Sequence, residues 1–378
     1  MDSLFNPVKV FIGEGSLSEL PSLIKKRKYI VISSRGFNSR GWNNYFSKAE
    51  CIIDSVSPNP TIRELSEHIQ SIKDIECDTL VAIGGGSVID VAKAISVSPN
   101  SSEDGIMDIL LNTKDGLKKR FNVIAIPTTA GTGAEVTPFA TIWDEKNKKK
   151  LSLQSPNIYP KYAIIDAQLA LTLGVEMTAY SGLDALSHCF ESLWNKNANP
   201  YSKSLAFSAI NIILDTLAEL LNNLENLELR KKMAWASMLG GLCINQTKTA
   251  LAHSMSYPLT SHLNIPHGLA SGGFLPEILK FNLENDKSDT MMEIQQTLSI
   301  YHPLKNRLEN LYNQIIEMGL LDSIFQNETK IYSLKNEMIH PERSLNNIVN
   351  GTSEDIQSIL VSFYNKKRNR KSELTSNN

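Results

Sequence analysis

The pattern of apolar and polar residues gives the two parts of the chain a different character. Up to about residue 165, short apolar runs alternate with helical patterns, which predicts an α/β fold with a largely parallel sheet. Two of these runs are apolar almost throughout, as expected for strands that are covered on both faces. The expected strands are Val8–Ile12, Tyr29–Ser33, Thr79–Ile83, Asn122–Ile126 and Ala163–Ile165.

Beyond about residue 170, long helical patterns replace the β-like runs. They cover residues 176–196, 201–223, 227–245, 288–318 and 353–366. In the first of them, Leu183, Leu186, Phe190 and Leu193 form one apolar stripe at helical spacing. The sequence therefore predicts a Rossmann-like parallel-sheet domain over residues 1–170, followed by an all-helical domain over residues 171–378.

The amino-acid composition and net charge limit the kinds of binding partner that the protein can have. Apolar residues make up 42% and charged residues 21% of the 378, the balance of a globular protein. The formal net charge of −2 creates no large field that would attract nucleic acid or an anionic membrane. A local basic pocket for a small anionic substrate is still compatible with this charge.

The cysteines and the N-terminus indicate the compartment. The four cysteines are scattered without a C-x-x-C pair, which argues against a disulfide framework and against a cysteine-based zinc site. Residues 1–6 lack the basic and apolar segments of a signal peptide. No apolar stretch approaches the ~18 residues that span a bilayer. We therefore expect a cytoplasmic protein.

A run of glycines follows the strand Thr79–Ile83. Gly84-Gly-Gly-Ser87 opens a helical pattern over Val88–Ile95, so its backbone N–H groups and the helix dipole favour a pyrophosphate. The run is not the G-x-G-x-x-G fingerprint. A tight turn that needs glycine for its conformation alone is the alternative, although three glycines exceed what a turn requires.

A second turn with small residues follows the strand Asn122–Ile126. Its hydroxyls, on Thr128, Thr129 and Thr132, suit hydrogen bonds to a ligand at the carboxyl edge of the sheet. A solvent-exposed threonine loop would look the same. Two such turns after two parallel strands reinforce each other.

A carboxylate and several histidines suggest a metal site in the second part of the chain. Asp184 and His188 are four residues apart and project from one helix face. His253 and His267 follow, the latter in an expected turn. One carboxylate and three imidazoles suit Fe²⁺ or Zn²⁺, while hydrogen-bonded core histidines are the alternative. Glu191 is either a rival ligand or, as we favour, a helix-surface charge.

The other histidines carry less signal. His262 lies near the cluster on an expected loop, and its role is ambiguous. We expect His68, His302 and His340 to be structural or surface residues, because none of them has metal-ligand spacing.

The ordered motifs together resemble the iron-containing (group III) alcohol dehydrogenases, a branch of the dehydroquinate-synthase-like superfamily. The resemblance covers most of the chain and is weakest over residues 280–340. It implies interconversion of a small aldehyde and its alcohol with NADH or NADPH, in a homodimer or larger homo-oligomer. The motifs are Asn6–Gly15, Pro58–Thr61, Gly84–Lys93, Ile126–Glu135, Gly182–His188 and Ile265–Gly268.

The resemblance also assigns roles to individual residues, which make the first domain dinucleotide-binding and the second metal-binding. The implied metal ligands are Asp184, His188, His253 and His267. The residues implied to contact the cofactor are Gly85, Gly86 and Ser87 at the pyrophosphate, Thr128, Thr129 and Thr132 beside it, and Lys150 at a ribose.

Two departures from the family pattern affect catalysis and cofactor choice. Many members have a histidine near the nicotinamide where this chain has Tyr257, whose hydroxyl either donates a proton or only packs. An aspartate that grips the adenine-ribose hydroxyl is replaced by Ser34-Arg35. Loss of that carboxylate removes repulsion of a 2′-phosphate, and Arg35 can pair with it, so we predict that NADPH is accepted and even preferred.

A third departure concerns the substrate. Asn245–His253 and the following Ser256–Thr260 look like the phosphonoacetaldehyde-reductase subgroup, which implies a phosphonate-bearing aldehyde. Lys248 then directs a cation at the phosphonate, or it is a plain helix-surface lysine. The segment from Arg343 to Asn347 is also similar to that subgroup, but the sequence alone gives it no role.

Other functions remain open on the sequence. Within the dehydrogenases, a general short-chain alcohol oxidoreductase or a glycerol-type zinc enzyme is the main competing interpretation. A dehydroquinate-synthase-like lyase would need a dense set of cations for a phosphorylated sugar acid, and it would show no net NAD(P)H turnover. A scaffold without activity would bind cofactor and catalyse nothing, although every candidate ligand is present here.

Overall fold

The structure, a computed structural model, describes residues 5–98, 101–111, 117–300 and 303–376. Its contacts divide the chain into two compact units, each of which is described by itself. The α/β unit comprises Ser3–Leu173 and Glu225–Asn245, and the helical unit comprises Gly174–Leu224 and Gln246–Asn378. The first division lies close to the boundary expected at residue 170, but one stretch of the later sequence groups with the α/β unit.

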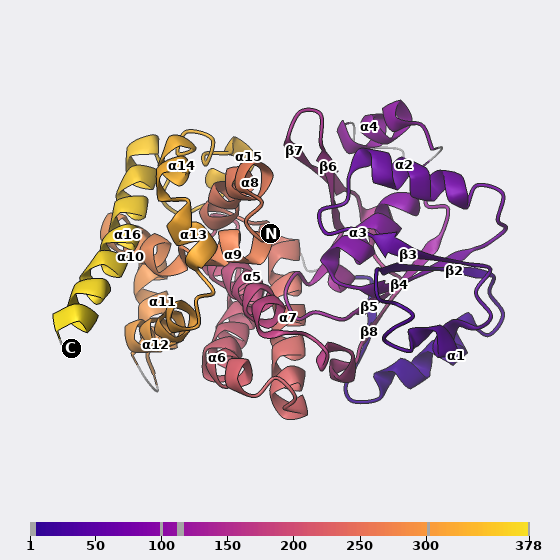
Figure 1. Cartoon of the computed structure of the whole chain (residues 1–378), viewed down its shortest axis with the longest axis horizontal. Coiled ribbons are helices and arrows are strands. Elements are labelled where there is room, and N and C mark those ends of the chain that lie inside the picture. Colours follow the sequence, from indigo (N-terminus) through magenta and orange to yellow (C-terminus); the bar gives the residue numbers. More distant parts are fainter. Residues whose placement is uncertain (1–4, 99–100, 112–116, 301–302, 377–378) are drawn as a thin grey trace. The chain divides into compact units, whose positions relative to one another are not determined.

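The α/β unit is built on a six-stranded parallel sheet with the order β1-β8-β5-β4-β2-β3 (Figure 1). The predicted parallel sheet and its five expected strands are confirmed. The strands of this sheet are β1 (Lys9–Ile12), β2 (Tyr29–Ser34), β3 (Cys51–Val56), β4 (Thr79–Gly84), β5 (Asn122–Pro127) and β8 (Tyr162–Ile165). An antiparallel hairpin adds β6 (Phe139–Asp144) and β7 (Lys149–Gln154).

The sequence analysis missed β3 and the hairpin, for identifiable reasons. Strand β3 is at the edge of the sheet, and its apolar run is interrupted by Asp54 and Ser55. Strand β7 begins with two lysines and is only partly buried. The hairpin turn is closed locally, where the backbone N–H of Asn147 donates to Oδ1 of Asp144 over 3.1 Å.

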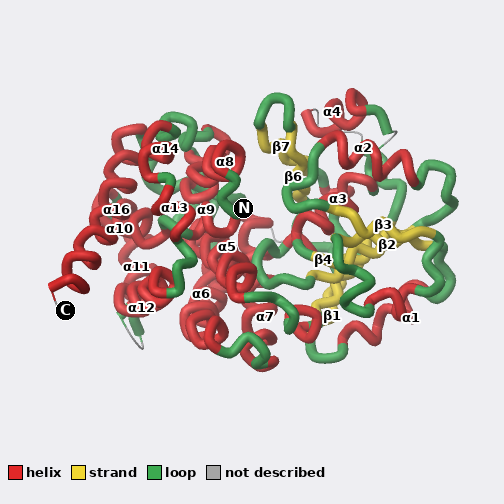
Figure 2. The backbone as a smooth tube through the Cα atoms, viewed as in Figure 1, coloured by secondary structure: helices red, strands yellow, loops and turns green. Residues whose placement is uncertain are grey.

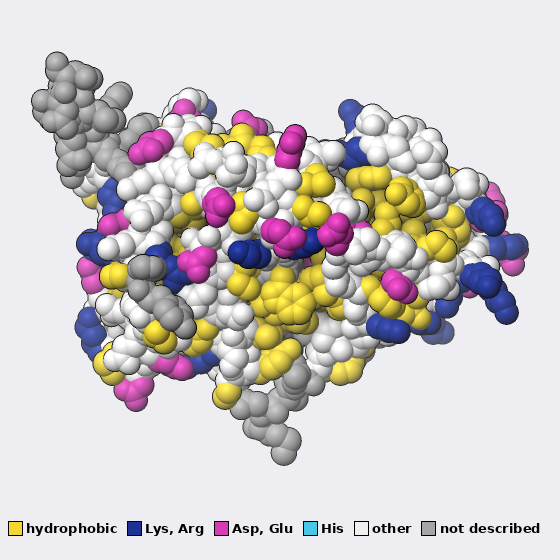
Figure 3. Space-filling model, turned by 90° about the horizontal axis from the view of Figure 1, so that it is seen from below, with side chains coloured by type: hydrophobic (Ala, Val, Ile, Leu, Met, Phe, Trp, Pro, Cys, Tyr) yellow, Lys and Arg dark blue, Asp and Glu magenta, His cyan; other side chains and the backbone are white. Residues whose placement is uncertain are grey.

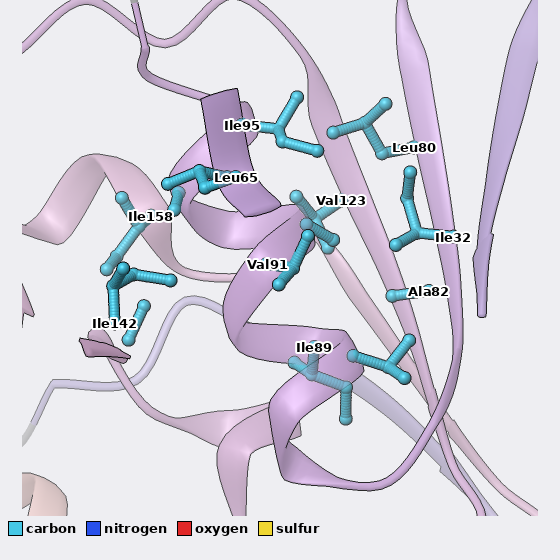
Figure 4. Packing of buried hydrophobic residues seen from close by; sticks show 14 of the residues in the cluster. Ile32, Leu65, Leu80, Ala82, Ile89, Val91, Ile95, Val123, Ile142 and Ile158 are labelled. Carbon is cyan, nitrogen blue, oxygen red and sulfur yellow. The ribbon is translucent and has the colours of Figure 1, made fainter. Parts of the chain in front are cut away.

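Side chains from both faces of the sheet are buried, because successive strand residues point in opposite directions. In β4, Leu80 and Ala82 belong to one apolar cluster, whereas Val81 and Ile83 belong to the other. Figure 4 shows the first cluster, to which helix α3 contributes Ile89. The helices of the first face are α2 (Ile62–Ser71), α3 (Gly86–Ile95) and α4 (Glu103–Leu111). The second face packs η1 (Ser16–Glu19), α1 (Leu20–Ile24) and η2 (Trp42–Phe46).

Among its described residues, the helical unit has only helices as regular secondary structure, apart from one isolated bridge between Asn195 and Asn347 (Figure 2). Its helices are α5 (Val175–Leu193), α6 (Pro200–Asn222), α8 (Leu251–Leu263), α9 (His267–Gly272), α10 (Leu275–Asn285), α11 (Asp289–Leu298), α12 (Leu304–Glu317), α13 (Asp322–Gln326), α14 (Glu328–Ser333), α15 (Pro341–Ser344) and α16 (Ser353–Ser376). The single helix expected over residues 288–318 is wrong, because α11 and α12 are separate and Pro303 caps the second.

Most of helix α7 (Leu227–Thr247) groups with the α/β unit. The reason is a close backbone approach between Gly241 of α7 and Gly133, which has a φ of +60°. A Cβ on Gly133 would lie 2.4 Å from the Cα of Gly241, so neither position has room for a side chain. Helix α7 therefore rests directly on the threonine-containing turn that follows β5.

Helix α6 corrects one expectation from the sequence. With 23 residues and a mean hydropathy of 1.5 in its most apolar window, it is long and apolar enough to cross a membrane. Half of that window is buried inside the structure, and the helix packs on α5 and α12. A buried core helix passes the same length and composition test, so this finding is weak support for a membrane span.

Acidic and basic side chains are interspersed over the face that Figure 3 shows.

Candidate active site

Three helices of the helical unit bring the four expected metal ligands together. Asp184 and His188 come from α5, His253 from α8, and His267 begins α9 instead of lying in a turn. Oδ1 of Asp184 is 3.9 Å from Nε2 of His188, 3.6 Å from that of His253 and 3.9 Å from that of His267. Ligands about 2.1 Å from a tetrahedral ion lie roughly 3.4 Å apart, so these distances suit a metal. Asp184, His188 and His253 are all buried.

Glu191 fixes the orientation of His253. Its Oε2 accepts a hydrogen bond from Nδ1 of His253 at 2.5 Å, and its Oε1 accepts one from the His253 backbone N–H at 3.1 Å. The expectation that Glu191 is a helix-surface charge is wrong, because its side chain is fully buried. A proton on Nδ1 leaves the Nε2 lone pair directed at Asp184, which is the tautomer that binds a metal.

Close packing of α9 on α5 determines where His267 lies. A Cβ on Gly268 would lie 2.0 Å from the carbonyl oxygen of Tyr180, and one on Gly272 would lie 2.6 Å from the Cβ of Leu183. Only glycine fits at both positions. In the same helix, Oγ of Ser271 donates to Oδ1 of Asp184 over 2.9 Å and so holds the carboxylate in place.

The charges of the cluster depend on each other. Burial alone would raise the pKa of Asp184, but the facing imidazoles hold it far below its usual range. Burial disfavours the charged form of His253, but Glu191 and Asp184 raise its pKa to about 9. The carboxylates therefore make this a strong site for positive charge.

The residues present fit a divalent metal. Nε2 of His253 is buried and makes no hydrogen bond within the described part of the chain, although burial of an unpaired polar atom is costly. The donor set is one carboxylate oxygen and three imidazole nitrogens, without sulfur, which suits Fe²⁺ or Zn²⁺. A cation bound by these four atoms would be the missing partner of Nε2 of His253.

The glycine turn and the threonine turn lie against each other in the α/β unit. Strands β4 and β5 are paired up to Gly84 and Pro127, and the backbone N–H of Thr128 donates to the carbonyl of Gly84 over 3.0 Å. A Cβ on Gly86 would lie 2.6 Å from Cγ2 of Thr132. None of Gly84, Gly85 and Gly86 has a positive φ, so these glycines are required for space and not for an unusual conformation.

This arrangement leaves the start of α3 open to a ligand. Gly85 is the N-cap of α3 and supplies no side-chain cap, so the first N–H groups of the helix keep their capacity to donate. Gly85, Gly86 and Ser87 are half-buried, and so are Thr129 and Thr132, whereas Thr128 is buried. The expected pyrophosphate residues are thus at the carboxyl end of the sheet, as predicted from the sequence.

A buried charged group ties α3 to the β6–β7 hairpin. Nζ of Lys93 donates to the carbonyl of Phe139 over 2.8 Å, and Oδ2 of Asp90 accepts from the backbone N–H of Thr141 over 2.9 Å. Burial lowers the pKa of Lys93 to about 8 and raises that of Asp90 to about 6. The charge of Lys150, half-buried on β7, opposes the shift of Asp90, which places this lysine near α3.

The expected adenine-ribose residues end strand β2. Ser34 is half-buried and Arg35 is exposed, directly after it. Ser33 is buried and bonded to the carbonyl of Ile83, so it is not available to a ligand. An exposed guanidinium at this edge remains free to meet a 2′-phosphate.

Tyr257 and Lys248 lie in the helical unit. Tyr257 is one turn after His253 on α8, and its hydroxyl accepts a hydrogen bond from Nε of Arg343 over 3.0 Å. Lys248 is exposed, lies between α7 and α8 and has a φ of +63°, which is uncommon for a residue other than glycine. The sequence analysis did not anticipate the contact of Arg343, because the two residues are 86 positions apart.

The remaining described histidines are outside the cluster. His262 pairs with Glu337 over 2.9 Å at the surface, and His68 is 3.4 Å from Glu64. His340 is packed against the ring of Tyr257, with 5.5 Å between ring centroids. His302 lies outside the described residues.

The comparisons with known proteins define the class. Residues 7–167 match the family described as iron-containing alcohol dehydrogenase, and residues 178–364 match its C-terminal domain. The chain belongs to the iron-containing alcohol dehydrogenase family. It is therefore an enzyme, an alcohol dehydrogenase that works with a metal and with NAD(P)(H), as the resemblance implied.

Individual relatives come from several branches of this family. The chain is 32% identical to the NADPH-dependent butanol dehydrogenase of Clostridium saccharobutylicum over 286 residues, or 73% of each chain. It is 27% identical to alcohol dehydrogenase 4 of Saccharomyces cerevisiae over 377 residues, which are 94% of this chain and 96% of that one. The NAD⁺ complex of sulfoacetaldehyde reductase from Bifidobacterium kashiwanohense has a TM-score of 0.87 and 27% identity, over 96% and 99% of the two chains.

Proposed function

We propose that this dehydrogenase reduces a small aldehyde that carries an anionic head group, phosphonoacetaldehyde in particular, to its alcohol, 2-hydroxyethylphosphonate. The single observation that carries the reaction class is the buried set of Asp184, His188 and His253, with His267 beside it. A metal bound there supplies Lewis-acid polarisation of the carbonyl, and the nicotinamide supplies the hydride.

The chain's own residues position these groups. Glu191 and Ser271 hold His253 and Asp184 in the orientation that directs their lone pairs inward. The N-terminus of α3 and the threonine turn hold the cofactor phosphates through backbone N–H groups and hydroxyls. Tyr257 remains a candidate proton donor, because its hydroxyl accepts from Arg343 and keeps its own proton.

An anionic substrate is supported by two observations. The structure similar to this chain with a TM-score of 0.87 belongs to a protein named for sulfoacetaldehyde, a two-carbon aldehyde with a tetrahedral anionic head group. In this chain Lys248 is exposed and held in a strained backbone conformation, with its carbonyl accepting from Asn195 over 3.2 Å. An exposed lysine suits a phosphonate as a point charge.

The substrate test is turnover of NADPH and NADH by the Fe²⁺-loaded enzyme with phosphonoacetaldehyde, beside propanal and butanal. We expect a kcat/KM for the phosphonate at least tenfold above that for either neutral aldehyde. Equal or better turnover of the neutral aldehydes would favour a general short-chain alcohol dehydrogenase. Lys248→Ala should lower the preference for the phosphonate.

We propose that NADPH is preferred over NADH, because Arg35 follows β2 where a ribose-binding carboxylate would repel the 2′-phosphate. Arg35→Ala should reduce the preference roughly tenfold, in line with the loss of one charge-assisted contact. Arg63→Ala offers a matched control, since Arg63 is an exposed arginine on α2 that pairs with Glu67 over 3.0 Å. A higher kcat/KM with NADH in the unmodified enzyme would overturn the preference.

A homodimeric or larger assembly and a cytoplasmic location are proposed from the sequence and its resemblance. Sedimentation of the purified protein tests the assembly, and fractionation of the source cells tests the location.

A further inference from the structure

The segment around α15 is fastened along helix α8, which carries His253. Oγ of Ser254 donates to the carbonyl of Met338, and the backbone N–H of His340 donates to the same Oγ, both over 2.6 Å. Nδ2 of Asn346 donates to the carbonyl of Thr249 over 2.8 Å. The segment is thus held at both ends, so the side chains between these ends have defined positions.

Arg343 lies in this fastened segment and faces the region of the metal ligands. Its Nε donates to the hydroxyl of Tyr257, which is one helical turn after His253 and therefore on the same face of α8. Burial lowers the pKa of Arg343, but Tyr257, Glu342 and Glu191 outweigh this and raise it. Because Tyr257 and the metal ligand His253 share this face, the contact with Tyr257 places the guanidinium beside the part of α8 that carries His253.

The guanidinium of Arg343 has unused capacity. No ion pair of Arg343 with a carboxylate is found among the described residues, and its second hydrogen bond, from Nη1 to the carbonyl of Glu342, is long at 3.5 Å. A half-buried arginine is normally paired with an anion. The planar guanidinium binds tetrahedral oxyanions through two parallel hydrogen bonds, which an ammonium group cannot do.

We infer that Arg343 is the residue that binds the anionic head group of the substrate, with Tyr257 as the residue that orients its guanidinium. This inference rests on the proposed function, since it assigns the recognition of a phosphonate or sulfonate aldehyde to a particular side chain. Lys248 directly precedes Thr249, whose carbonyl accepts a hydrogen bond from Asn346, so the backbone of Lys248 lies beside the Arg343 segment. Tyr257, which stands where many family members have a histidine, therefore contributes to the specificity for an anionic substrate.

The test compares selectivity across variants. The quantity measured is the ratio of kcat/KM for phosphonoacetaldehyde, and separately for sulfoacetaldehyde, to kcat/KM for propanal, all with the metal-loaded full-length enzyme. Arg343→Lys keeps the charge but loses the paired hydrogen bonds, and we expect the ratio to fall at least tenfold. Lys335→Ala is the matched control, since this lysine is an exposed cation of the same unit bonded to Gln357, and its ratio should stay unchanged.

A binding measurement provides a readout apart from turnover. Calorimetric titration with 2-hydroxyethylphosphonate should show affinity weakened at least tenfold in Arg343→Lys, and a thermal melt shows whether the variant is folded. Tyr257→Phe separates two roles of the tyrosine. If Tyr257 orients Arg343, the ratio falls, whereas loss of a proton donor lowers kcat for charged and neutral aldehydes alike and leaves the ratio intact.

The outcomes distinguish this inference from the proposed substrate. Selectivity for the phosphonate that is lost in Arg343→Lys supports both. Selectivity that persists in Arg343→Lys, with unchanged binding of 2-hydroxyethylphosphonate, keeps the proposed function and overturns the role of Arg343. Preference for sulfoacetaldehyde that depends on Arg343 supports the inference and overturns the phosphonate. An enzyme without preference for either anion overturns both.

Discussion

The metal cluster and the cofactor turns recognise their ligands by opposite means. At the cluster, side chains supply every ligand atom, and other side chains, Glu191 and Ser271, hold them in place. At the cofactor turns, we propose that backbone N–H groups do most of the binding, because a Cβ at Gly85 or Gly86 would meet Thr129 or Thr132. Removing an atom should therefore damage the first site, whereas adding one should damage the second.

The largest expected effect is the loss of a metal ligand. His188→Ala removes one of four ligand atoms from a site in which Asp184 and His253 are buried. We expect metal content and turnover to fall together, the latter by roughly a thousandfold or more, because Lewis-acid catalysis contributes several kcal/mol. Metal analysis and cofactor oxidation measure both. His262→Ala, at the surface, is the control and should keep both.

The next effect is on stability, and it concerns buried charge beside the cofactor turns. Burial raises the pKa of Glu135 from 4.5 to about 7, although Lys93 opposes the shift. The folded state therefore holds this proton more tightly, so its contribution to stability is complete below pH 4.5 and is lost as the pH rises through about 7. The loss amounts to a few kcal/mol at most.

Glu135→Gln should flatten this pH dependence. Urea unfolding at pH 5 and pH 7 measures the free energy of unfolding in both proteins. We expect the difference between the two pH values to shrink in the variant. An identical difference in the two proteins would show that Glu135 ionises normally in the folded state.

A smaller effect is expected from filling the space between the turns. The Cβ of Gly86→Ala would lie 2.6 Å from Cγ2 of Thr132, so the turn has to shift. Overpacking costs about 1–3 kcal/mol, and if this whole cost opposes cofactor binding, the cofactor KM rises roughly 5- to 150-fold. Metal content should stay the same. Gly174→Ala is the control, because nothing lies within 4 Å of its added Cβ; unchanged cofactor KM in Gly86→Ala would contradict the account.

The smallest effect tests the carboxylate behind the metal ligand. Glu191→Gln keeps the shape of the side chain but removes the charge that stabilises the Nδ1 proton of His253. Partners of this kind typically contribute 10- to 100-fold to metal affinity, and the isosteric change should give about tenfold. Competition with a chelator measures it. Glu219→Gln, which changes an exposed residue, should leave the metal affinity unchanged. Equal metal affinities in the two variants would show that Glu191 does not support the metal site.

The sequence predicted the parts of the molecule that depend on local patterns. The buried strands were recognisable from their apolar runs, and the candidate metal cluster from residue types whose spacing is partly local, as in Asp184 and His188. Glu191 was misjudged because its burial comes from α8, whose His253 is 62 positions away. The contact of Arg343 with Tyr257 spans 86 positions and leaves no periodic signal.

Edges and hairpins were missed for a related physical reason. Strand β3 has a neighbour on one side only, and the β6–β7 hairpin pairs outside the main sheet. Neither needs a continuous apolar run, so polar residues such as Asp54 and Lys149 interrupt the pattern that identifies buried strands. The split between α11 and α12 was signalled by Pro303, which favours the start of a helix over its interior.

The most direct test of the central claim is the dependence of turnover on metal bound at the Asp184 cluster. The enzyme is stripped with a chelator, retitrated with Fe²⁺ and with Zn²⁺, and assayed for aldehyde reduction after each addition. We predict no turnover in the stripped enzyme and full recovery at one metal ion per chain, absent in His188→Ala. Undiminished turnover in the stripped enzyme, or recovery in His188→Ala, would contradict the account.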